Sequence, residues 1–481
     1  MTEYKLFIAG EWIPTKTGEI IEDKNPADGS VYALVHTAGP EELETAIAKG
    51  VEAQPVWEAF DAEQRERVLL KAADHLEANV ERYTDMLLSE SGACINKAKH
   101  EVLGSANVFR AAAGECRRVD GGVVQGEFMG ELSYWIRQPL GLVAGIGPFN
   151  FPLLLCVNKV SFGLAAGNSF ILKPASDTPL SGVIIAEALE AAGLPKGVFS
   201  SVPGKGSVIG DKIVEDPRVK MISFTGSTAV GSGIAVKAAQ HLKKVALEMG
   251  GKNPLIVLAD CDMDQAIGTA LFGTFFHQGQ VCMATGRIIV EEAIYDEFTE
   301  KLAARISRMK AGDPRDPKSF VGPLINEKHC LEIDELIDDA IAKGAELVCG
   351  RTHEGAFYQP TMIKNVTPDM RIFREETFGP VASVIRAKDA DDALRLCNDN
   401  EYGLSSGIMT QDISKAIKFA HKMNSGMVRV NDTTIMGSRR APFGGVKNSG
   451  VGRDGGVFAI DSFTELKWIS IRYEKKGFPP I

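Results

Sequence analysis

The sequence is poor in the cysteine patterns that build metal sites and disulfide frameworks. Eight cysteines are scattered through 481 residues, without a CxxC pair and without a histidine-rich neighbourhood. This spacing argues against a zinc site and is typical of free thiols in a reducing compartment. The N-terminal segment MTEYKLFIAGEW has no apolar core of the signal-peptide type. We therefore expect a cytoplasmic protein that binds no metal.

The sequence also lacks a surplus of positive charge and any long uninterrupted apolar run. Its 53 Lys and Arg against 63 Asp and Glu give a net charge of −10, which repels nucleic acids and anionic lipid surfaces. The most apolar stretch, residues 140–167, is interrupted by Pro148, Asn150, Pro152 and Lys159 before it could span a bilayer. We therefore expect no nucleic-acid partner and no membrane association.

Short apolar runs alternate with helical patterns along most of the chain. The runs at 169–173, 198–202 and 219–224 are separated by helical patterns at 180–192 and 206–215. Strands that alternate with helices favour a parallel sheet covered by helices on both faces. A second alternation follows, with apolar runs at 254–258, 287–292, 346–350, 382–387 and 427–431. The predicted fold is α/β, with two doubly wound parallel-sheet domains in series.

Four segments stand apart from this alternation. Apolar residues at three- and four-residue steps predict one long amphipathic helix over 62–88. Residues 130–138 and 463–478 alternate between polar and apolar, and predict exposed strands that need a partner edge, for which another subunit is one candidate. The glycine-rich segment 248–254 has the composition of a connection between domains, where a crevice would suit an active site.

The segment FTGSTAVG, residues 224–231, predicts a strand that turns into a helix. Ser227 and Thr228 could cap that helix and leave backbone N–H groups free for a phosphate. Lys173, at the end of another predicted strand, would add a positive charge at the same sheet edge. An ordinary strand–helix turn and a solvated lysine explain the same residues, and the GxGxxG fingerprint is absent.

Three residues carry groups suited to covalent catalysis. Cys282 lies between a glycine turn and a predicted strand, where a partly exposed thiol in a positive field would ionise. Glu248 is flanked by Leu247 and Met249, and apolar neighbours raise the pKa of a carboxyl toward the range of a general base. Asn150, between two prolines, could donate to an oxyanion. The alternatives are a buried structural cysteine, a surface ion pair and a turn asparagine.

Together, a nucleophile, a base, an oxyanion donor and a phosphate-binding turn are the parts needed to oxidise an aldehyde covalently. The chain resembles the NAD(P)-dependent aldehyde dehydrogenase superfamily almost from end to end. The resemblance rests on seven motifs in the family's order: GPFNFP, ILKPAS, FTGST, EMGGKNP, GQVC, EETFGP and PFGGVKNSG. The tail FTELKWIS is similar to the benzaldehyde and vanillin dehydrogenase branch.

The resemblance implies a role for each matching residue. Cys282 would be the nucleophile, Glu248 the general base and Asn150 the oxyanion amide. Lys173 would bind the adenosine ribose and support the catalytic centre. The other cofactor-binding residues implied are Ser176, Gly206, Phe224, Thr225, Gly226, Ser227, Met249, Glu376 and Phe378. Asp454 stands where many members have a glutamate, which puts a proton-relay role there in doubt.

The resemblance also implies domain boundaries and an assembly. Residues 1–119 and 140–250 would form the dinucleotide-binding domain and residues 251–448 the catalytic domain. Residues 120–139 and 460–481 would form a small β oligomerisation arm. Dimers and tetramers of the family share such arms, so we expect a homodimer or a homotetramer.

Cofactor choice is expected to depend on Ser176. Strongly NAD-preferring members often carry a glutamate at this position, whose carboxylate repels the 2′-phosphate of NADP. The serine therefore predicts that NADP is accepted, with NAD as the other candidate cofactor. A serine that makes no contact with either cofactor is the alternative.

Substrate expectations come from a predicted tunnel. The residues expected to line it are Phe151, Leu154, Leu155, Ile435 and Met436. This apolar lining suits an aromatic or medium-sized hydrophobic aldehyde. Arg439 and Arg440, close by in sequence, could instead bind an anionic aldehyde such as a semialdehyde or a sulfonated aldehyde. Solvated surface arginines are the alternative.

The predicted reaction is oxidation of an aldehyde to the carboxylic acid with reduction of NAD(P)+. Cys282 would form a thiohemiacetal and then a thioester, with Asn150 stabilising the alkoxide and Glu248 activating the hydrolytic water. Glu248 favours hydrolysis over acyl transfer to coenzyme A, the reaction of a branch that generally lacks this base. Outside enzyme chemistry, the alternative is a catalytically silent structural homologue.

Overall fold

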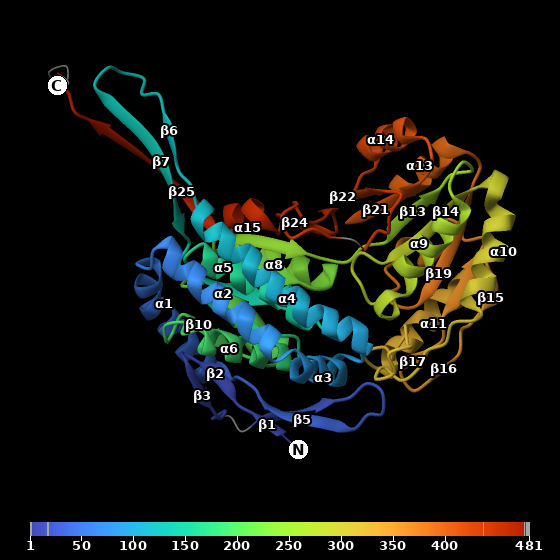
Figure 1. The fold of residues 1–481 in the computed structure, drawn as a ribbon, viewed down its shortest axis with the longest axis horizontal. Coiled ribbons are helices and arrows are strands. Elements are labelled where there is room, and N and C mark those ends of the chain that lie inside the picture. Colours follow the sequence, from blue (N-terminus) through green and yellow to red (C-terminus); the bar gives the residue numbers. More distant parts are fainter. Residues whose placement is uncertain (1, 17–18, 436, 476, 478–481) are drawn as a thin grey trace.

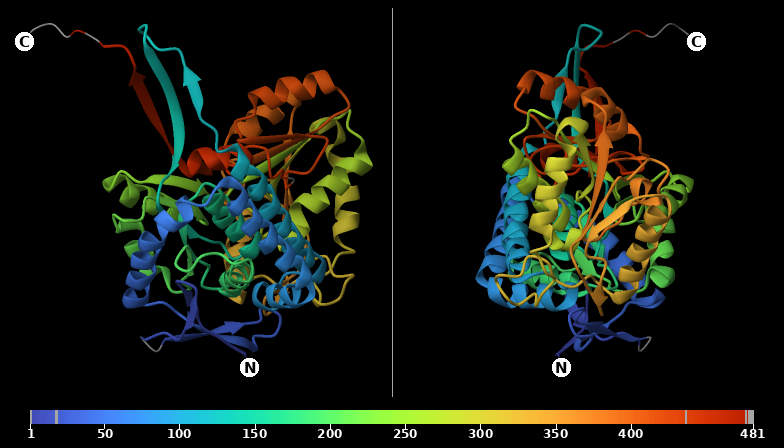
Figure 2. Two further views of the ribbon diagram at one scale, coloured as in Figure 1. Left: turned by 60° about the vertical axis from the view of Figure 1, so that its left-hand side comes forward. Right: turned by 90° about the vertical axis from the view of Figure 1, so that its right-hand side faces the viewer.

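Two large sheets lie side by side, each covered by helices, and a ribbon of strands projects from the body (Figure 1). The computed structural model describes residues 2–16, 19–435, 437–475 and 477. In both views of Figure 2 the ribbon extends beyond the body. Within the described residues, no helix is both long and apolar enough to cross a membrane.

The first sheet has eight strands in the order β24-β12-β11-β8-β9-β10-β2-β3. They are β2 (Leu6–Ile8), β3 (Glu11–Ile13), β8 (Leu142–Ile146), β9 (Ser169–Lys173), β10 (Phe199–Ser201), β11 (Met221–Thr225), β12 (Lys244–Glu248) and β24 (Gly450–Val451). The five strands from β12 to β10 are parallel. The pairings at both edges are antiparallel. The predicted parallel sheet is confirmed, with short antiparallel strands added outside it.

Helices cover both faces of this sheet. In β9, Phe170 and Leu172 belong to a core shared mainly with α2 to α6, whereas Ile171 belongs to a core shared with α1, α7 and α8. The helices are α1 (Pro40–Glu58), α2 (Ala62–Ala78), α3 (Val80–Ser91), α4 (Ile95–Glu115), α5 (Pro152–Ala165), α6 (Leu180–Ala191), α7 (Asp211–Glu215), α8 (Thr228–Gln240) and α15 (Gly456–Ser462). Because both faces are buried, the central strands carry consecutive apolar residues rather than an alternating pattern.

The predicted single helix over residues 62–88 is wrong. α2 ends at Ala78 and α3 begins at Val80, with Asn79 between them at φ −114° and ψ 22°. The Asn79 side-chain amide donates to the carbonyl of His75 at 2.9 Å. An asparagine side chain competes for backbone hydrogen bonds in this way and favours a break. The apolar periodicity continues across the break, so periodicity alone could not place it.

The second sheet has seven strands in the order β15-β18-β19-β14-β13-β21-β22. They are β13 (Asn253–Val257), β14 (Thr285–Glu291), β15 (Glu346–Cys349), β18 (Thr361–Lys364), β19 (Val381–Ala387), β21 (Ser405–Met409) and β22 (Met427–Val430). All its pairings are parallel except that of β15, the predicted run at 346–350, which joins the edge in antiparallel orientation. Two short antiparallel pairs lie outside it: β16 (His353–Glu354) with β17 (Phe357–Tyr358), and β20 (Tyr402–Gly403) with β23 (Val446–Lys447).

This sheet is also buried on both faces. In β13, Ile256 belongs to a core with α11, α13 and α14, and its neighbours Leu255 and Val257 belong to a core with α9 and α10. The helices are α9 (Met263–Phe275), α10 (Tyr295–Ile306), α11 (Glu327–Ala342), α12 (Arg371–Arg374), α13 (Ala390–Asn398) and α14 (Ile413–Lys422). The α/β class with two doubly wound sheets is therefore confirmed.

Two three-stranded sheets complete the fold. One near the N-terminus contains β1 (Thr2–Tyr4), β4 (Ile20–Lys24) and β5 (Val31–His36), and the projecting arm contains β6 (Gly122–Val124), β7 (Glu131–Pro139) and β25 (Thr464–Arg472). β7 and β25 pair along their full length, with Trp135 opposite Trp468. The two predicted exposed strands are thus partners of each other within one chain.

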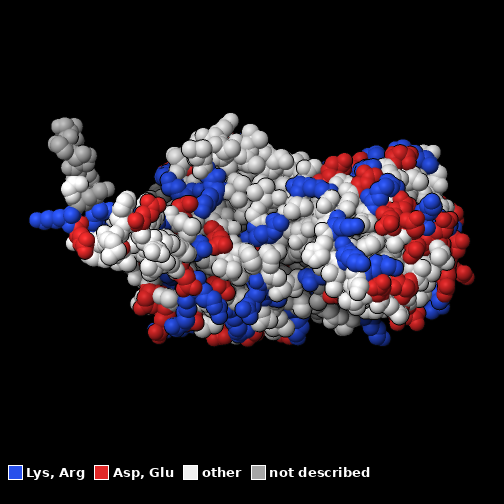
Figure 3. All heavy atoms as spheres, turned by 90° about the horizontal axis from the view of Figure 1, so that it is seen from above, with Lys and Arg blue, Asp and Glu red and all other residues white. Residues whose placement is uncertain are grey.

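Surface charge is mixed over the face seen from above. Figure 3 shows acidic and basic side chains interspersed there. Exposed ion pairs such as Lys301–Glu297 at 2.6 Å and Arg386–Asp296 at 2.8 Å illustrate this mixing on the surface of the second sheet's helices and strands. The net charge of −10 therefore does not gather into a field of one sign on the face shown.

Parallel register brings the ends of four strands to one edge of the first sheet. Ile146, the last residue of β8, pairs with Lys173 in β9 and with Phe224 in β11. Thr225 pairs with Glu248, the last residue of β12. The strand order reverses between β8 and β11, because β9 lies on one side and β12 on the other. Ligands of α/β proteins commonly bind at such a reversal, beyond the carboxyl ends of the strands.

Candidate active site

Asn253 lies at the connection between the two sheets and holds the segment that carries Cys282. β12 of the first sheet ends at Glu248, and Asn253 begins β13 of the second. The Asn253 amide Nδ2 donates to the carbonyl oxygens of Cys282 and Ala284, both at 2.8 Å. Its Oδ1 accepts from the backbone N–H of Ser405 at 2.9 Å. The predicted connection between the sheets therefore also anchors Cys282.

The thiol of Cys282 lies against the carboxyl of Glu248. Cys282 is 9% exposed and Glu248 is 5% exposed. Burial, and next the carboxyl of Glu248, raise the pKa of the Cys282 thiol well above its ordinary value. Burial raises the pKa of Glu248 to about 8, while Cys282 and the Lys159 ammonium act in the opposite direction. Among the described residues, neither carboxyl oxygen of Glu248 has a hydrogen-bond partner of regular geometry.

The raised pKa expected for Glu248 is confirmed, but the positive field expected at Cys282 is wrong. The charged groups that act on the thiol are the carboxyls of Glu248 and Glu376, and both disfavour a thiolate. Only the backbone N–H of Met283 favours it. The carboxylate form of Glu248 is therefore the natural acceptor for the Cys282 proton. Sequence neighbours gave no sign of this, because Glu248 lies on another sheet.

Asn150 lies in the loop between β8 and α5, 3% exposed. Its amide Nδ2 donates to the carbonyl of Gln280 at 2.9 Å. An amide nitrogen carries two hydrogens, so the second stays available to another acceptor. The bond to Gln280 ties this amide to the segment that carries Cys282. The structure thus brings together three predicted catalytic residues, Cys282, Glu248 and Asn150.

The chain reaches Cys282 through a tight turn. His277, Gln278 and Gly279 have positive φ values of 51°, 58° and 71°. For residues other than glycine, this conformation costs roughly 1–3 kcal/mol each and is found where surrounding contacts enforce it. The Gln278 side chain supplies such contacts, because its amide donates to the carbonyls of Gly92 at 3.1 Å and Pro323 at 2.7 Å. The turn is therefore held from outside in the shape that presents Cys282.

The turn between β11 and α8 is suited to a phosphate. Ser227 caps α8, with its hydroxyl accepting from the backbone N–H of Val230 at 3.4 Å. Thr228, the other predicted cap, instead donates to the carbonyl of Asn448 at 3.0 Å. The remaining N–H groups of the first turn have no partner inside the helix, and such groups are suited to bind an anion. A Cβ at Gly226 would lie 2.6 Å from the Phe224 ring, so the turn requires glycine there.

Lys173 lies at the carboxyl end of β9 and is 5% exposed. Its ammonium donates to the carbonyl of Pro174 at 3.1 Å, and burial lowers its pKa to about 8. A buried ammonium with spare donors suits the hydroxyl groups of a ribose. Ser176 is exposed nearby in sequence, with its hydroxyl donating to the carbonyl of Gly204 at 3.3 Å. Gly206 is exposed with open space around its Cα.

Glu376 and Phe378 lie in a loop of the second sheet that reaches the connection between the two sheets. Glu376 Oε1 accepts from the backbone N–H of Gly251 at 3.0 Å, and burial raises its pKa to about 7. A Cβ at Gly250 would lie 2.0 Å from Glu376 Oε2, so glycine is required for this approach. Phe378 has φ 49°, and its ring meets the Phe149 ring edge-on at 5.7 Å.

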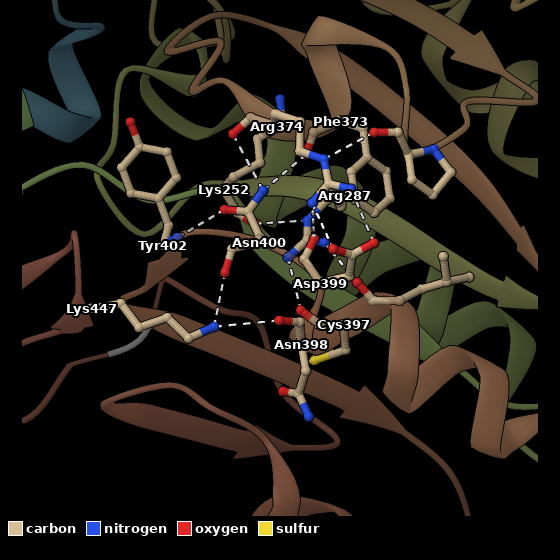
Figure 4. Close-up of polar contacts among 12 residues, drawn as sticks. Lys252, Arg287, Phe373, Arg374, Cys397, Asn398, Asp399, Asn400, Tyr402 and Lys447 are labelled. Carbon is tan, nitrogen blue, oxygen red and sulfur yellow. Dashed lines mark hydrogen bonds and ion pairs between the residues drawn. The ribbon is translucent and has the colours of Figure 1, made fainter.

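One buried cation, Lys252, bonds to this loop, and a second, Arg287, holds the backbone of Lys252 (Figure 4). The Lys252 ammonium donates to the hydroxyl of Thr377 at 2.6 Å. Arg287 Nε donates to the carbonyl of Lys252 at 3.0 Å, and its two Nη atoms donate to the carbonyls of Leu396 at 2.8 Å and Cys397 at 3.0 Å. Burial lowers the pKa of Lys252 to about 7 and that of Arg287 to about 10. Sequence analysis did not identify either residue.

The groups at this sheet edge match the parts of NAD(P)+. The α8 N-terminus offers N–H groups for a pyrophosphate, and Lys173 offers a buried cation near the adjoining strand end. Glu376 keeps its Oε2 beside the glycine pair 250–251, where a ribose hydroxyl could bond to it. These groups fit a dinucleotide that follows the carboxyl edge of the first sheet toward Cys282.

The predicted tunnel begins on α5. Its half-buried residues follow at three- and four-residue spacing, which places them on one face: Phe151, Leu154 and Leu155. Ile435 is 9% exposed, and its neighbour Thr434 donates to the carbonyl of Met283 at 2.7 Å, next to Cys282. Met436, the last predicted tunnel residue, lies outside the described residues.

A cluster of phenylalanines adjoins this face, and sequence analysis missed it. Phe276 stacks on Phe272 with ring centres 4.9 Å apart and planes 17° apart. It also lies 6.4 Å from both Phe151 and Phe320. Phe272 and Phe320 are 37% and 40% exposed, so the cluster runs from the surface to the tunnel residue Phe151. The four-residue spacing of Phe272 and Phe276 was the available signal.

Arg439 lies beside Leu154, one of the predicted tunnel residues. Its guanidinium donates twice to the carbonyl of Gly104, at 3.1 and 3.3 Å. A Cβ at Gly104 would meet both Arg439 Nη2 at 3.0 Å and Leu154 Cδ1 at 3.5 Å. No carboxylate pairs with Arg439 in the described part of the chain, and burial lowers its pKa. Arg440, by contrast, is exposed.

Asp454 lies close enough to act on the base. It is one of the groups that raise the pKa of Glu248. A cavity of about 10 Å³ is lined by Glu248, Phe443 and Asp454 among others. This volume is at the lower limit for a single water molecule. The region beside the base could therefore hold the water that Glu248 would activate.

Comparison with known proteins decides the family. Residues 12–469 match the model of the aldehyde dehydrogenase family. The chain belongs to this family. A vanillin dehydrogenase of Pseudomonas fluorescens is 38% identical over 482 residues, which cover 100% of both chains. The crystal structure of a salicylaldehyde dehydrogenase from Pseudomonas putida G7, complexed with salicylaldehyde, is 38% identical with a TM-score of 0.97 and covers 100% of both chains.

A third relative is named for a different substrate. A succinate-semialdehyde dehydrogenase of Escherichia coli, named for NADP(+), is 37% identical over 467 residues, which cover 96% of this chain and 97% of the relative. The family predicted from the seven motifs is thus confirmed, and so is its activity class. This aldehyde dehydrogenase is an oxidoreductase that acts on aldehydes, and its family uses NAD(P)+.

Proposed function

We propose that this protein oxidises aromatic aldehydes to carboxylic acids with NAD(P)+ through a thioester on Cys282. The observation that carries the proposal is the meeting of Cys282, Glu248 and Asn150 beside a cluster of four phenylalanines. Aromatic rings pack well against other aromatic rings, edge-on or offset. The names of the vanillin and salicylaldehyde relatives support the same substrate class.

Cys282 makes the first bond. Its proton passes to the carboxylate of Glu248 as Sγ adds to the aldehyde carbon, and the carbonyl oxygen becomes an alkoxide. The second N–H of the Asn150 amide and the backbone N–H of Cys282 donate to that oxygen. One such donor is typically worth ~3 kcal/mol of the barrier. When bound, NAD(P)+ accepts the hydride that leaves the same carbon, and the adduct on Cys282 becomes a thioester.

Glu248 then directs hydrolysis. After its proton returns to solvent, the carboxylate takes a proton from water as the water oxygen adds to the thioester carbon. The carbon–sulfur bond breaks, the carboxylic acid leaves and Cys282 recovers its thiol. Apart from the Cys282 thiol, no described side chain bonds to the oxygens of Glu248, which leaves them available to water. We therefore propose hydrolysis rather than transfer to coenzyme A.

The cofactor site that we propose follows the carboxyl edge of the first sheet. Gly226 and Ser227 would hold the pyrophosphate, Lys173 and Ser176 the adenosine ribose, and Glu376 with Phe378 the nicotinamide half. The other residues proposed to border the cofactor are Gly206, Phe224, Thr225 and Met249. The absence of a carboxylate at Ser176 supports use of NADP as well as NAD. On this assignment, residues 1–119 and 140–250 bind the dinucleotide and residues 251–448 supply the nucleophile.

An aldehyde panel assayed with both nucleotides tests the proposal. Benzaldehyde, vanillin and salicylaldehyde should exceed hexanal and succinic semialdehyde in kcat/KM by about tenfold or more, because tunnel contacts act on the transition state. The acid should form without coenzyme A. A preference of similar size for succinic semialdehyde, or a requirement for coenzyme A, would contradict the proposal.

An anionic aldehyde is the second candidate substrate, and Arg439 favours it. This guanidinium lies beside Leu154 with one carbonyl partner, that of Gly104, and no paired carboxylate in the described part of the chain. If the substrate is anionic, Arg439→Ala should lower kcat/KM for succinic semialdehyde by about tenfold or more and leave benzaldehyde unchanged, since a charged hydrogen bond would be lost. Arg440→Ala is the matched control.

The arm supports a homodimer or homotetramer. Val123 is 77% exposed and Trp468 is 70% exposed on it, and a groove of about 460 Å³ lined by Leu132, Trp135 and Ile136 among others lies on the same arm. Apolar surface on a projecting strand pair suits an isologous contact with a second copy. All eight cysteines are unpaired, which supports a reducing compartment such as the cytoplasm.

A further inference from the structure

A buried ion pair lies beneath the loop that carries Asn150. Lys97 and Glu101 are on successive turns of α4, 3% and 0% exposed, with Lys97 Nζ 2.6 Å from Glu101 Oε2. It is the one ion pair among the described residues in which both side chains are almost fully buried. Burying two charges carries a desolvation penalty of roughly several kcal/mol per ion. Such a pair is a poor way to gain stability alone.

The Lys97 ammonium makes three direct contacts among the described residues. Besides Glu101, it donates to the backbone carbonyl of Asn150 at 2.6 Å. It also lies 4.2 Å from the centre of the Phe151 ring, within the range of a cation–π contact. An ammonium has three donors, and here they face a carboxylate, a carbonyl and an aromatic ring. Two of these three partners belong to the predicted active site.

The Glu101 carboxylate binds the next part of the same loop. Its Oε1 accepts from the backbone N–H groups of Leu153 at 2.9 Å and Leu154 at 3.1 Å. These are N–H groups of the first turn of α5, which have no partner inside the helix. A carboxylate at a helix N-terminus also interacts favourably with the helix dipole. The pair therefore holds the segment from Asn150 to Leu154 at both ends.

We propose that Lys97 and Glu101 are positioning residues for aldehyde oxidation. They would set the place of the Asn150 amide relative to Cys282 and of the Phe151 ring beside the phenylalanine cluster. The inference rests on the proposed function. An apolar pair of similar volume could pack as well, but it could offer neither the donor to the Asn150 carbonyl nor the acceptor for α5. Sequence analysis did not single out either residue.

Steady-state kinetics of matched variants test this role. The variants are Lys97→Met, Glu101→Gln and the double variant K97M/E101Q, which leaves no unpaired buried charge. Lys99→Met is the control, because Lys99 lies on the same helix, is 48% exposed and pairs with Glu81 at the surface. We expect kcat to fall about tenfold or more in the double variant while KM changes less than about threefold, because a misplaced oxyanion donor acts on the transition state. Lys99→Met should stay within about twofold of the wild type, as an exposed pair contributes little.

A double-mutant cycle with Asn150→Ala separates positioning from stability. In the Asn150→Ala background, K97M/E101Q should lower kcat by less than about threefold, because the group that the pair positions is absent. A pair that only stabilises the fold would lower the melting temperature and leave kcat of the folded protein unchanged. The proposal would be overturned if K97M/E101Q lowered kcat by the same factor with and without Asn150→Ala. An unchanged kcat in K97M/E101Q would overturn it as well.

The experiment has separate controls for a variant that fails to fold and for an error in the substrate class. If Lys97→Met fails to fold, Glu101→Gln carries the same prediction, because its amide oxygen can still accept from α5 while the charge that holds Lys97 is lost. The assay uses the best aldehyde of the panel, so that an error in substrate class leaves the test intact. If no aldehyde supports nucleotide reduction by the wild type, the proposed function fails and the positioning role fails with it. An active wild type with unaffected variants overturns the positioning role alone.

Discussion

The thiol of Cys282 and the carboxyl of Glu248 share one buried site, in which the carboxyl makes ionisation of the thiol harder while the thiol favours the carboxylate. Two groups coupled in this way titrate as a pair, so the apparent pKa values belong to both. At neutral pH the site favours the state in which the thiol keeps its proton and Glu248 is largely neutral. Nucleophile and base are thus linked through one proton, which Cys282 must release before Glu248 can act on water.

The rate should rise with pH through the titration of this pair. Because the pKa of Glu248 is raised from 4.5 to about 8, its basic form increases as pH rises toward and above 8. We expect kcat to increase with an apparent pKa near 8, measured from pH 6 to 9.5. In Glu248→Gln this increase should disappear. An apparent pKa near 4.5, or an unchanged profile in the variant, would contradict the assignment of the base.

Loss of the Asn150 amide should affect the chemical step more than binding. Asn150→Ala removes the donor expected at the alkoxide, so we expect kcat to fall about 100- to 1000-fold with a smaller change in KM. Asn96→Ala is the control, because the Asn96 amide donates to the carbonyl of Pro317 at the surface and does not touch the loop. Equal loss in both variants, or a change confined to KM, would show that Asn150 does not act on the oxyanion.

A single substitution should change the choice of nucleotide. Ser176→Glu places a carboxylate where a 2′-phosphate is proposed to lie, and like charges repel strongly in a binding site. We expect kcat/KM with NADP to fall about tenfold or more relative to kcat/KM with NAD. Ser176→Gln, of similar size without the charge, is the matched control. If the ratio is the same in all three proteins, Ser176 does not contact the adenosine ribose.

Substitutions on the arm should change the molecular mass of the assembly in solution. Leu466 and Trp468 lie on one face of β25, 58% and 70% exposed. Charging both positions, as in Leu466→Glu with Trp468→Glu, should dissociate the assembly, because a desolvated apolar contact does not tolerate unpaired carboxylates. Light scattering after gel filtration would then report a single chain. Lys301→Glu, on the surface of α10 and away from the arm, should keep the wild-type mass, and an undissociated double variant would place the interface elsewhere.

Much of the fold could be predicted because the central strands are buried on both faces. Runs such as 169–173 have consecutive apolar residues in their centre, without alternation, which indicates a parallel sheet under two helical layers. The break at Asn79 could not be found in the same way, since apolar periodicity continues across it. The pairing of β7 with β25 joins residues more than 300 positions apart, and no local pattern encodes such a partner.

The candidate site could be predicted only in part for a related reason. Cys282, Glu248 and Asn150 stand in recognisable motifs, and the raised pKa of Glu248 followed from its apolar neighbours. The sign of the field at Cys282 depends on carboxyls from other segments, so its sequence neighbours gave the wrong expectation. Sequence analysis did not single out Lys97, because its carbonyl partner Asn150 is supplied by a distant loop.

Trapping the acyl group on Cys282 tests the central claim most directly. Glu248→Gln, incubated with NAD(P)+ and the best aldehyde of the panel, should release about one NAD(P)H per subunit in a rapid burst and then stall, because hydrolysis lacks its base. Mass spectrometry of the quenched protein should find one acyl group, on the peptide that contains Cys282. Cys282→Ala should show neither burst nor adduct. A variant that turns over without an adduct, or an acyl group on another cysteine, would contradict the account.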